Sequence, residues 1–109
     1  MLEEVTIKGI TAENVTFKNC HINKLTLANT FTVTSTYTFE NVTIGSYTEA
    51  STMKIKELTI VNSTFEENDT LTFTSNIEDS SYTINNIKFK DNLTVNYKAK
   101  SISISNLTS

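Results

Sequence analysis

The residues of this chain that are best suited to chemistry are its only cysteine and its only histidine, the neighbours Cys20 and His21. A thiolate and an imidazole in contact would form a nucleophile and its base. Both belong to a short segment typical of a β-strand, however, and neighbouring side chains on a strand point to opposite faces. We therefore expect Cys20 to be a small core residue and His21 a surface residue. One residue of each type also supplies too few soft ligands for a metal site.

Acidic side chains offer the next candidates for chemistry, and they gather at Glu66, Glu67 and Asp69. This segment lacks the glycine and the ligand spacing of a calcium loop, so we interpret it as a solvated loop that bulges from the fold. Glu49 and Asp79 stand at positions where the pattern is otherwise apolar. Because an unpaired buried carboxylate is costly, we expect the chain to turn there and release both to water. With no catalytic constellation, we expect no enzyme activity and no cofactor or metal.

The composition favours strands over helices. Of the 109 residues, 31 are Thr or Ser and 13 are Asn, and Pro, Trp and Arg are absent. The nine basic residues are all Lys and the net charge is −3, so the chain lacks the Arg forks that grip phosphate and guanine, and we expect no nucleic-acid binding. A single cysteine excludes an internal disulfide. No apolar run reaches 18 residues and no signal-peptide pattern opens the chain, so we expect no membrane insertion, while an extracellular surface or a virion is the favoured location.

A recurring asparagine organises the whole chain. Each member follows an alternation of apolar residues with Thr or Ser, as in Val15-Thr-Phe-Lys-Asn, at intervals of 22, 21, 24 and 20 residues. The five are Asn19, Asn41, Asn62, Asn86 and Asn106. A repeat of this length predicts a solenoid whose coils stack like residue on like residue. Asparagine suits a corner because it tolerates left-handed backbone and its amide can bond along the stack, so we interpret these five as a structural ladder.

The repeat predicts an all-β fold, a single right-handed parallel β-helix of about five coils of 20–24 residues over 5–109, with 1–4 as a short lead-in. Each coil would have four short sides with alternate residues pointing inward. The coils start at Val5, Leu25, Tyr47, Leu71 and Leu93, and the second sides at Ile10, Phe31, Met53, Ile77 and Tyr97. An antiparallel sandwich would instead need Asn-Gly or Asp-Gly hairpins, and neither Gly9 nor Gly45 follows Asn or Asp.

The five-residue sides of residues 15–29, Val-Thr-Phe-Lys-Asn, Cys-His-Ile-Asn-Lys and Leu-Thr-Leu-Ala-Asn, resemble pentapeptide-repeat proteins in geometry. The resemblance implies a right-handed β-helix. It departs from the family's pattern where a small residue is usual, because Val15, Leu25, Tyr37 and Leu58 stand there. For a subset of the family, the resemblance implies a role as a DNA mimic that binds topoisomerases. That role relies on a strongly acidic surface, which a net charge of −3 does not supply. Coils rich in Phe and Asn-x-Thr also look like the luminal β-helix of synaptic vesicle glycoproteins, which serves as a neurotoxin receptor.

Outward-facing polar residues offer possible binding and modification sites. One predicted column of hydroxyls, a possible binding face for a glycan, a protein or ice, consists of Thr6, Thr26, Thr48, Thr72 and Thr94. A second comprises Thr16, Thr38, Thr59, Thr83 and Ser103. Threonine is also simply a good exposed strand residue. Among the Asn-x-Thr sequons, Asn14, Asn68 and Asn92 lie off the ladder and are the possible glycosylation sites.

These patterns favour a non-enzymatic structural β-solenoid, either self-assembling or part of a surface fibre, virion fibre or adhesin. The 17 residues from Leu93 to Ser109 and the four of 1–4 together make 21, one ordinary coil, so two copies could continue one stack head to tail. Flanking coils of a longer protein would cover the same ends. The alternative is a binding module that uses the threonine face for a glycan, protein or ice surface. A fragment of a β-helix carbohydrate-active enzyme is the weaker alternative.

Overall fold

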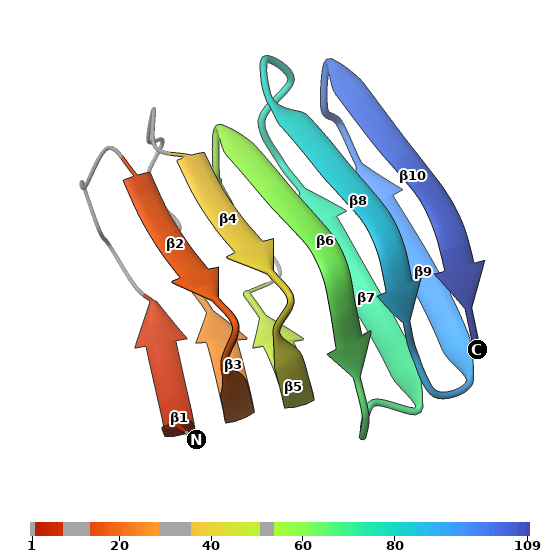
Figure 1. The fold of residues 1–109 in the computed structure, drawn as a ribbon. Coiled ribbons are helices and arrows are strands. Elements are labelled where there is room, and N and C mark those ends of the chain that lie inside the picture. Colours follow the sequence, from red (N-terminus) through yellow and green to blue (C-terminus); the bar gives the residue numbers. More distant parts are fainter. Residues whose placement is uncertain (1, 8–13, 29–35, 51–53) are drawn as a thin grey trace.

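The structure is a computed structural model that describes residues 2–7, 14–28, 36–50 and 54–109 (Figure 1). Strands make up most of the described chain because β-branched and aromatic residues alternate with Thr and Ser. They are β1 (Leu2–Ile7), β2 (Asn14–Lys18), β3 (His21–Leu27), β4 (Thr36–Glu40), β5 (Thr43–Glu49), β6 (Glu57–Phe65), β7 (Thr70–Ser75), β8 (Ser81–Lys88), β9 (Asn92–Tyr97) and β10 (Ser101–Thr108). The described residues include no helix of the length and apolarity that crossing a bilayer requires.

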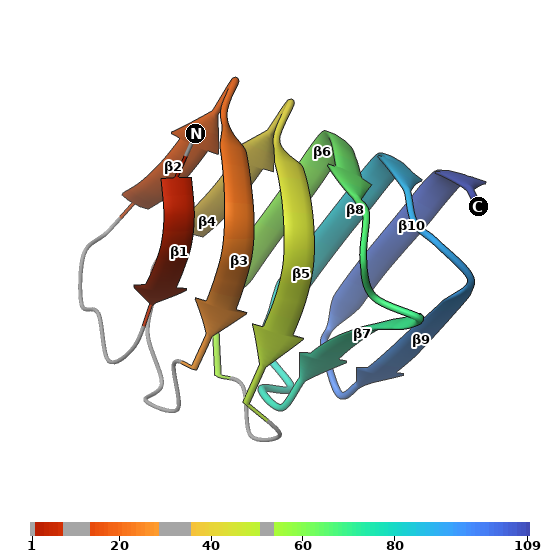
Figure 2. The ribbon, with the colours of Figure 1, turned by 90° about the horizontal axis from the view of Figure 1, so that it is seen from below.

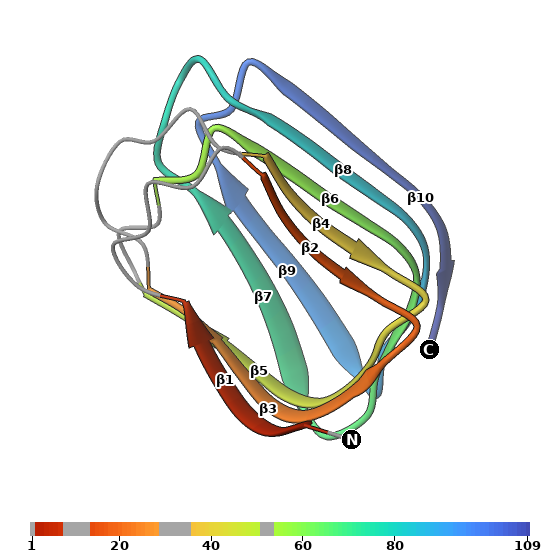
Figure 3. The ribbon, with the colours of Figure 1, turned by 60° about the vertical axis from the view of Figure 1, so that its left-hand side comes forward.

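Every strand pairing in the described chain is parallel, and the strands stack into a β-solenoid of about four turns. One face of the stack has the order β2-β4-β6-β8-β10, a second has β1-β3-β5, and β7 and β9 form a sheet of their own. Figure 3 looks along the stack, and the path from β1 through β2 to β3 runs clockwise as it recedes, so the β-helix is right-handed. The predicted fold class is confirmed.

The turns have fewer straight sides than the sequence predicts. Each of β3 and β5 continues from one predicted side into the next, because the chain stays extended between them. The predicted second sides are wrong where the structure describes them: Ile77 lies in a non-strand connection and Tyr97 ends β9 instead of starting a strand. The second sides at Ile10, Phe31 and Met53 lie outside the described residues. Strand β1 begins at Leu2, within the expected lead-in of 1–4, and Leu2 pairs with Ile22.

The core consists of columns of apolar side chains, one from each coil. One of the two longest is Phe17, Phe39, Ile60, Ile84 and Ile104, joined rung by rung in the register of the large sheet. Its three middle members are fully buried, whereas its two end members are half-buried. The predicted inward and outward assignment on this face is confirmed. The Phe17 and Phe39 rings stack with centroids 5.4 Å apart, which continues the column through the first coils.

The five recurring asparagines all have left-handed backbone, with φ between 50° and 57°. They are the described non-glycine residues in that region. Asn19 and Asn41 lie at bends between strands, whereas the other three lie within β6, β8 and β10, where the ladders skip them. Asn41 Nδ2 donates to Asn19 Oδ1 and Asn86 Nδ2 donates to Asn62 Oδ1, both at 2.7 Å. The bonding is not continuous, because Asn106 Nδ2 donates to Asn85 Oδ1 and no bond joins Asn41 with Asn62. The column is thus set by backbone conformation more than by side-chain bonding.

Candidate functional site at the seam between β5 and β7

The stack is interrupted where β5 should pair with β7. Strand β5 pairs along one edge with β3, and its other edge pairs with β6 only at Thr43 and Ile44. Strand β7 pairs with β9 and has no ladder with β5 (Figure 2). The interruption follows the segment 66–69, which adds residues between β6 and β7 and so displaces β7 from the β5 edge. We call this boundary the seam.

At one end of the seam, a side chain takes the place of the missing strand. The Asn68 amide accepts a hydrogen bond from the Tyr47 backbone N–H and donates one to the Tyr47 carbonyl, each at 2.8 Å. An amide can make both bonds because it carries an acceptor and a donor, as a peptide group does. Asn68 therefore satisfies the backbone N–H and carbonyl of Tyr47 at the edge of β5, so that β7 is not needed there.

At the other end, a phenol and a carboxyl of β5 bond each other, and a phenol of β8 bonds β7. The Tyr47 hydroxyl donates to Glu49 Oε2 at 2.6 Å, and the Tyr82 hydroxyl donates to the Thr74 carbonyl at 3.2 Å. Beneath them the rings of Tyr47, Phe65 and Phe73 pack with centroids 5.4 to 5.8 Å apart. Burial is the main cause that raises the pKa of both phenols, to about 12 for Tyr82, so they remain hydrogen-bond donors at neutral pH.

The prediction that Glu49 is released to water is wrong. Glu49 is the last residue of β5, it is largely buried, and its Oε1 makes no hydrogen bond of good geometry within the described chain. Burial raises the pKa of the carboxyl from 4.5 to about 7, although the Tyr47 hydroxyl and the nearby Thr74 hydroxyl and N–H act in the opposite direction. Near neutral pH this carboxyl therefore exists in both protonation states.

A groove of about 680 Å³ opens along the seam. Most of its lining residues have a hydroxyl or amide side chain, and Glu49 is among the others. The lining residues are Tyr47, Thr48, Glu49, Ala50, Asn68, Thr70, Thr72, Thr74, Asn76 and Asn96. This volume lies within the range of small-molecule sites. We call it the seam groove.

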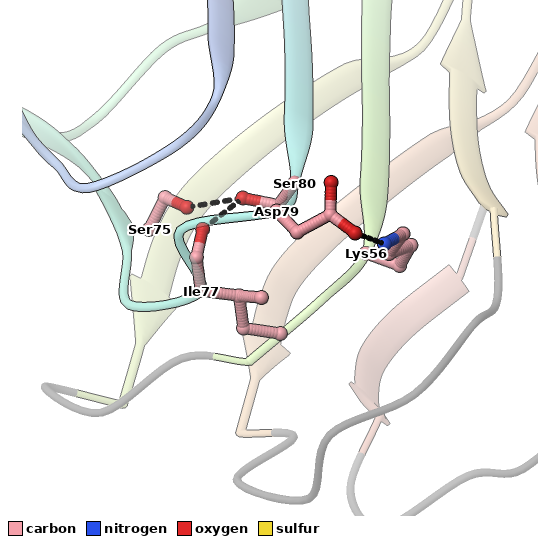
Figure 4. Close-up of polar contacts among 5 residues, drawn as sticks. All are labelled: Lys56, Ser75, Ile77, Asp79 and Ser80. Atoms are coloured by element: carbon pink, nitrogen blue, oxygen red, sulfur yellow. Dashed lines mark hydrogen bonds and ion pairs between the residues drawn. The ribbon is translucent and has the colours of Figure 1, made fainter.

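Asp79 behaves as the sequence predicts. The chain turns at residues 78–79, and the Asp79 side chain is exposed and bonded to Lys56 Nζ at 2.6 Å (Figure 4). The hydrogen bond and charge of Lys56 lower the pKa of the Asp79 carboxyl. Next to it the buried Ser80 hydroxyl donates to the Ile77 carbonyl at 2.6 Å and bonds the Ser75 hydroxyl at 2.9 Å. This turn is structural, because its polar groups satisfy one another.

Cys20 and His21 do not come together. Cys20 is half-buried and packs against the core, whereas the His21 side chain is partly exposed, with Nε2 3.7 Å from Glu66 Oε1. In the acidic segment, Asp69 pairs with Lys90 at 2.9 Å, and this bond raises the pKa of the Lys90 ammonium. Within the described ranges no three His, Cys, Asp or Glu side chains gather as metal ligands would.

The two threonine columns differ at the seam. Thr6, Thr26 and Thr48 lie in register, as do Thr72 and Thr94, but no ladder joins Thr48 to Thr72. The expected continuous face is therefore divided. The second column is unbroken, since successive pairings connect Thr16, Thr38, Thr59, Thr83 and Ser103.

The possible glycosylation sites have different surroundings. Asn14 is exposed at the start of β2, and the exposed Asn92 donates through Nδ2 to the Asp69 carbonyl at 3.2 Å. The Asn68 amide is occupied by Tyr47, so it is a poor acceptor for a glycan. The ladder residues Asn41, Asn62 and Asn106 are all exposed rather than buried.

The comparisons with known proteins leave the function to be argued from this geometry: no protein-family model, no curated protein and no solved structure matches the chain. Sequence reasoning identified the Glu49 position as irregular but assigned it to a turn. The segment Tyr47-Thr48-Glu49 could have indicated the burial of Glu49, because alternation places its phenol and its carboxyl on the same inward face of one strand.

Proposed function

We propose that this chain is a non-enzymatic structural β-solenoid unit that stacks head to tail with further copies of itself. The observation that carries the proposal is a pair of open edges in matching register. Within the described chain, β10 pairs with β8 on one edge only, and β2 pairs with β4 on one edge only. An unpaired parallel edge is a template for another strand.

At both of these edges, the last apolar side chains of the core columns are only partly covered by the rest of the chain. On β10, Ile102 and Ile104 are half-buried, and on β2 the same columns end in the half-buried Val15 and Phe17. Placing β2 of one copy on β10 of another would continue both columns at the ordinary strand spacing of about 4.8 Å. The apolar surface left open at each end supplies the driving force for that contact.

A third column, which ends at Leu107, shows most clearly which residues would meet between two copies. Leu107 is a large apolar side chain that is nevertheless 43% exposed. Its column descends through Ile87 and Ser63 by direct pairing, and Val42 and Cys20 hold the same place before the next strand in earlier coils. Leu107 of one copy would therefore lie against Cys20 of the next.

The register sets one condition on this junction. Leu2 pairs with Ile22 and Thr108 pairs with Lys88, so Ser109 of one copy and Leu2 of the next would fall in the same row. The expected 21-residue junction is therefore about two residues too long. Either the last two residues of one copy or the first two of the next must leave the strand. The contact joins two different surfaces, so it propagates as a linear filament and does not close as a dimer.

Light scattering and electron microscopy of the purified chain test the proposal. We expect linear assemblies of the wild-type chain that are lost in Leu107→Lys, because a charge would be buried at the junction. Ser103→Lys, on the outward face of the same strand, is the matched control and should still assemble. A wild-type chain that stays monomeric at high concentration would refute self-stacking and favour flanking coils of a longer protein.

A further inference from the structure

The seam is the place where the backbone ladders of the stack are interrupted. Within the described chain, β7 pairs with β9 alone, whereas β5 pairs with β3 and, at Thr43 and Ile44, with β6. Strands β7 and β9 run together in a direction different from that of β1, β3 and β5 (Figure 3). Backbone hydrogen bonds join neighbouring strands elsewhere in the stack, so across the seam side chains must join β5 to the β7–β9 pair.

The side-chain link at the Glu49 end of the seam connects three strands. On β5, Glu49 Oε2 accepts a hydrogen bond from the Tyr47 hydroxyl at 2.6 Å. From β7, the Thr74 hydroxyl and N–H act on the Glu49 carboxyl in the direction that lowers its pKa. The Thr74 carbonyl in turn accepts a hydrogen bond from the Tyr82 hydroxyl of β8 at 3.2 Å. One carboxyl thus connects β5 with β7 where the ladder is missing.

The same carboxyl is the weak point of this link. It is largely buried, and burial outweighs its donors and raises its pKa from 4.5 to about 7. The titratable groups that face it are the phenols of Tyr47 on β5 and Tyr82 on β8, and burial raises the pKa of both phenols, so that they stay uncharged at neutral pH. The described lining of the seam groove includes no lysine or histidine that could offset a negative charge.

The charged residues nearby do not compensate for ionisation either. Lys98 lines a separate hollow that adjoins the groove near Asn96, and the exposed Asp69 follows Asn68 at the other end of the seam. Glu49 Oε1 has almost no exposed surface in the closed seam. Because a buried carboxylate is costly without its hydration, the ionised group gains if β7 moves away and lets water in.

We propose that the seam is a latch that ionisation of Glu49 releases, so that β7 and β9 move away from β5 as one unit while the rest of the solenoid stays folded. In the closed seam the carboxyl holds its proton up to about pH 7, whereas in the open seam the hydrated group has an ordinary pKa near 4.5. The open form therefore gains on the closed form as the pH rises between these values, and gains no further above them. The latch lies within one copy and does not rest on the proposed stacking.

Hydrogen exchange followed by NMR at single amides from pH 5 to pH 8 tests the latch. The Thr74 N–H is the reporter, because it acts across the seam. Two other amides are controls. The Lys98 N–H bonds the Ser75 carbonyl at 2.9 Å inside the β7–β9 pair, and the Thr64 N–H bonds the Val42 carbonyl at 3.0 Å where the stack is intact.

The expected exchange pattern follows from proton linkage. After correction for the intrinsic exchange rate, the protection of the Thr74 N–H should fall roughly 70-fold from pH 5 to pH 8 in the wild type. It should stay constant in Glu49→Gln, because glutamine has no proton to release. It should fall as in the wild type in Glu78→Gln, which changes an exposed carboxylate outside the groove. At each pH both control amides should be roughly tenfold or more better protected than Thr74, because opening the seam does not break their bonds.

Four results would each overturn the latch. Equal protection of Thr74 and Thr64 at every pH would show that the seam opens only when the whole chain unfolds. Equal protection of Thr74 and Lys98 would show that β7 and β9 do not move as a unit. Protection of Thr74 that does not change with pH in the wild type, or that still falls in Glu49→Gln, would show that this carboxyl does not hold the seam.

Discussion

Replacing Glu49 with Gln should stabilise the chain, by an amount that the buried carboxyl itself determines. Burial raises the pKa of this group from 4.5 to about 7 in the folded chain. Holding the ionised form inside therefore costs about 3 kcal/mol relative to the unfolded chain. Glutamine keeps an oxygen for the Tyr47 hydroxyl and is never ionised, so it avoids this cost. We expect Glu49→Gln to be more stable than the wild type by up to about 3 kcal/mol at pH 8.

The pH dependence has a definite sign. Below pH 4.5 the carboxyl is protonated in both states and costs nothing. As the pH rises to about 7, the unfolded chain releases its proton first, so wild-type stability falls, and it levels off above the folded pKa. Urea unfolding from pH 4 to pH 8.5 measures the difference between the two chains, with Glu78→Gln as an exposed control. Parallel stability curves for wild type and Glu49→Gln would refute the buried carboxyl.

Three further changes test separate parts of the fold. Ile60→Ala should cost about 2 to 5 kcal/mol by opening a cavity while the outward Thr59→Ala costs little, and equal losses in urea unfolding would contradict the inward and outward assignment. Asn68→Ala should cost about 1 to 3 kcal/mol because it leaves the Tyr47 N–H and carbonyl unpaired, and an unchanged denaturation midpoint would show that the amide does not seal the strand edge. Deleting residues 108–109 should lower the concentration at which assemblies form in light scattering, because it removes one of the two terminal pairs that compete at the junction, whereas a higher threshold would argue against the register.

The face from β2 to β10 could be predicted from the sequence almost rung by rung. Two independent signals coincide there, an alternation with period two and an Asn that ends each segment. Left-handed backbone restricts the corner to few residue types, so the position of Asn62 or Asn86 is visible in the sequence. The hydrogen bonds between these side chains could not be predicted in the same way, because each exposed amide can choose among several neighbours, as Asn106 does with Asn85.

The seam could not be read from the repeat. A repeat predicts that like pairs with like, so it places Tyr47 beside Leu71, whereas the longer connection at 66–69 separates their strands. The consequence is a tertiary one: Asn68 fills a strand edge, and Glu49 is kept inside by a phenol on its own strand. Hydrophobic pattern alone treats Glu49 as a residue to expose, because it ignores the hydrogen bond that makes its burial tolerable.

The most direct test of head-to-tail stacking is a disulfide across the junction. Cys20 and Leu107 occupy one column, so in a stacked pair their Cα atoms would lie about 4.8 Å apart, within the range that a disulfide spans. We predict that Leu107→Cys, oxidised gently, forms a ladder of covalent oligomers whose linked peptides contain residues 20 and 107. The same chain with Cys20→Ser should not form the ladder. Oligomers that persist without Cys20, or a Leu107→Cys chain that remains monomeric under oxidation, would contradict stacking in this register.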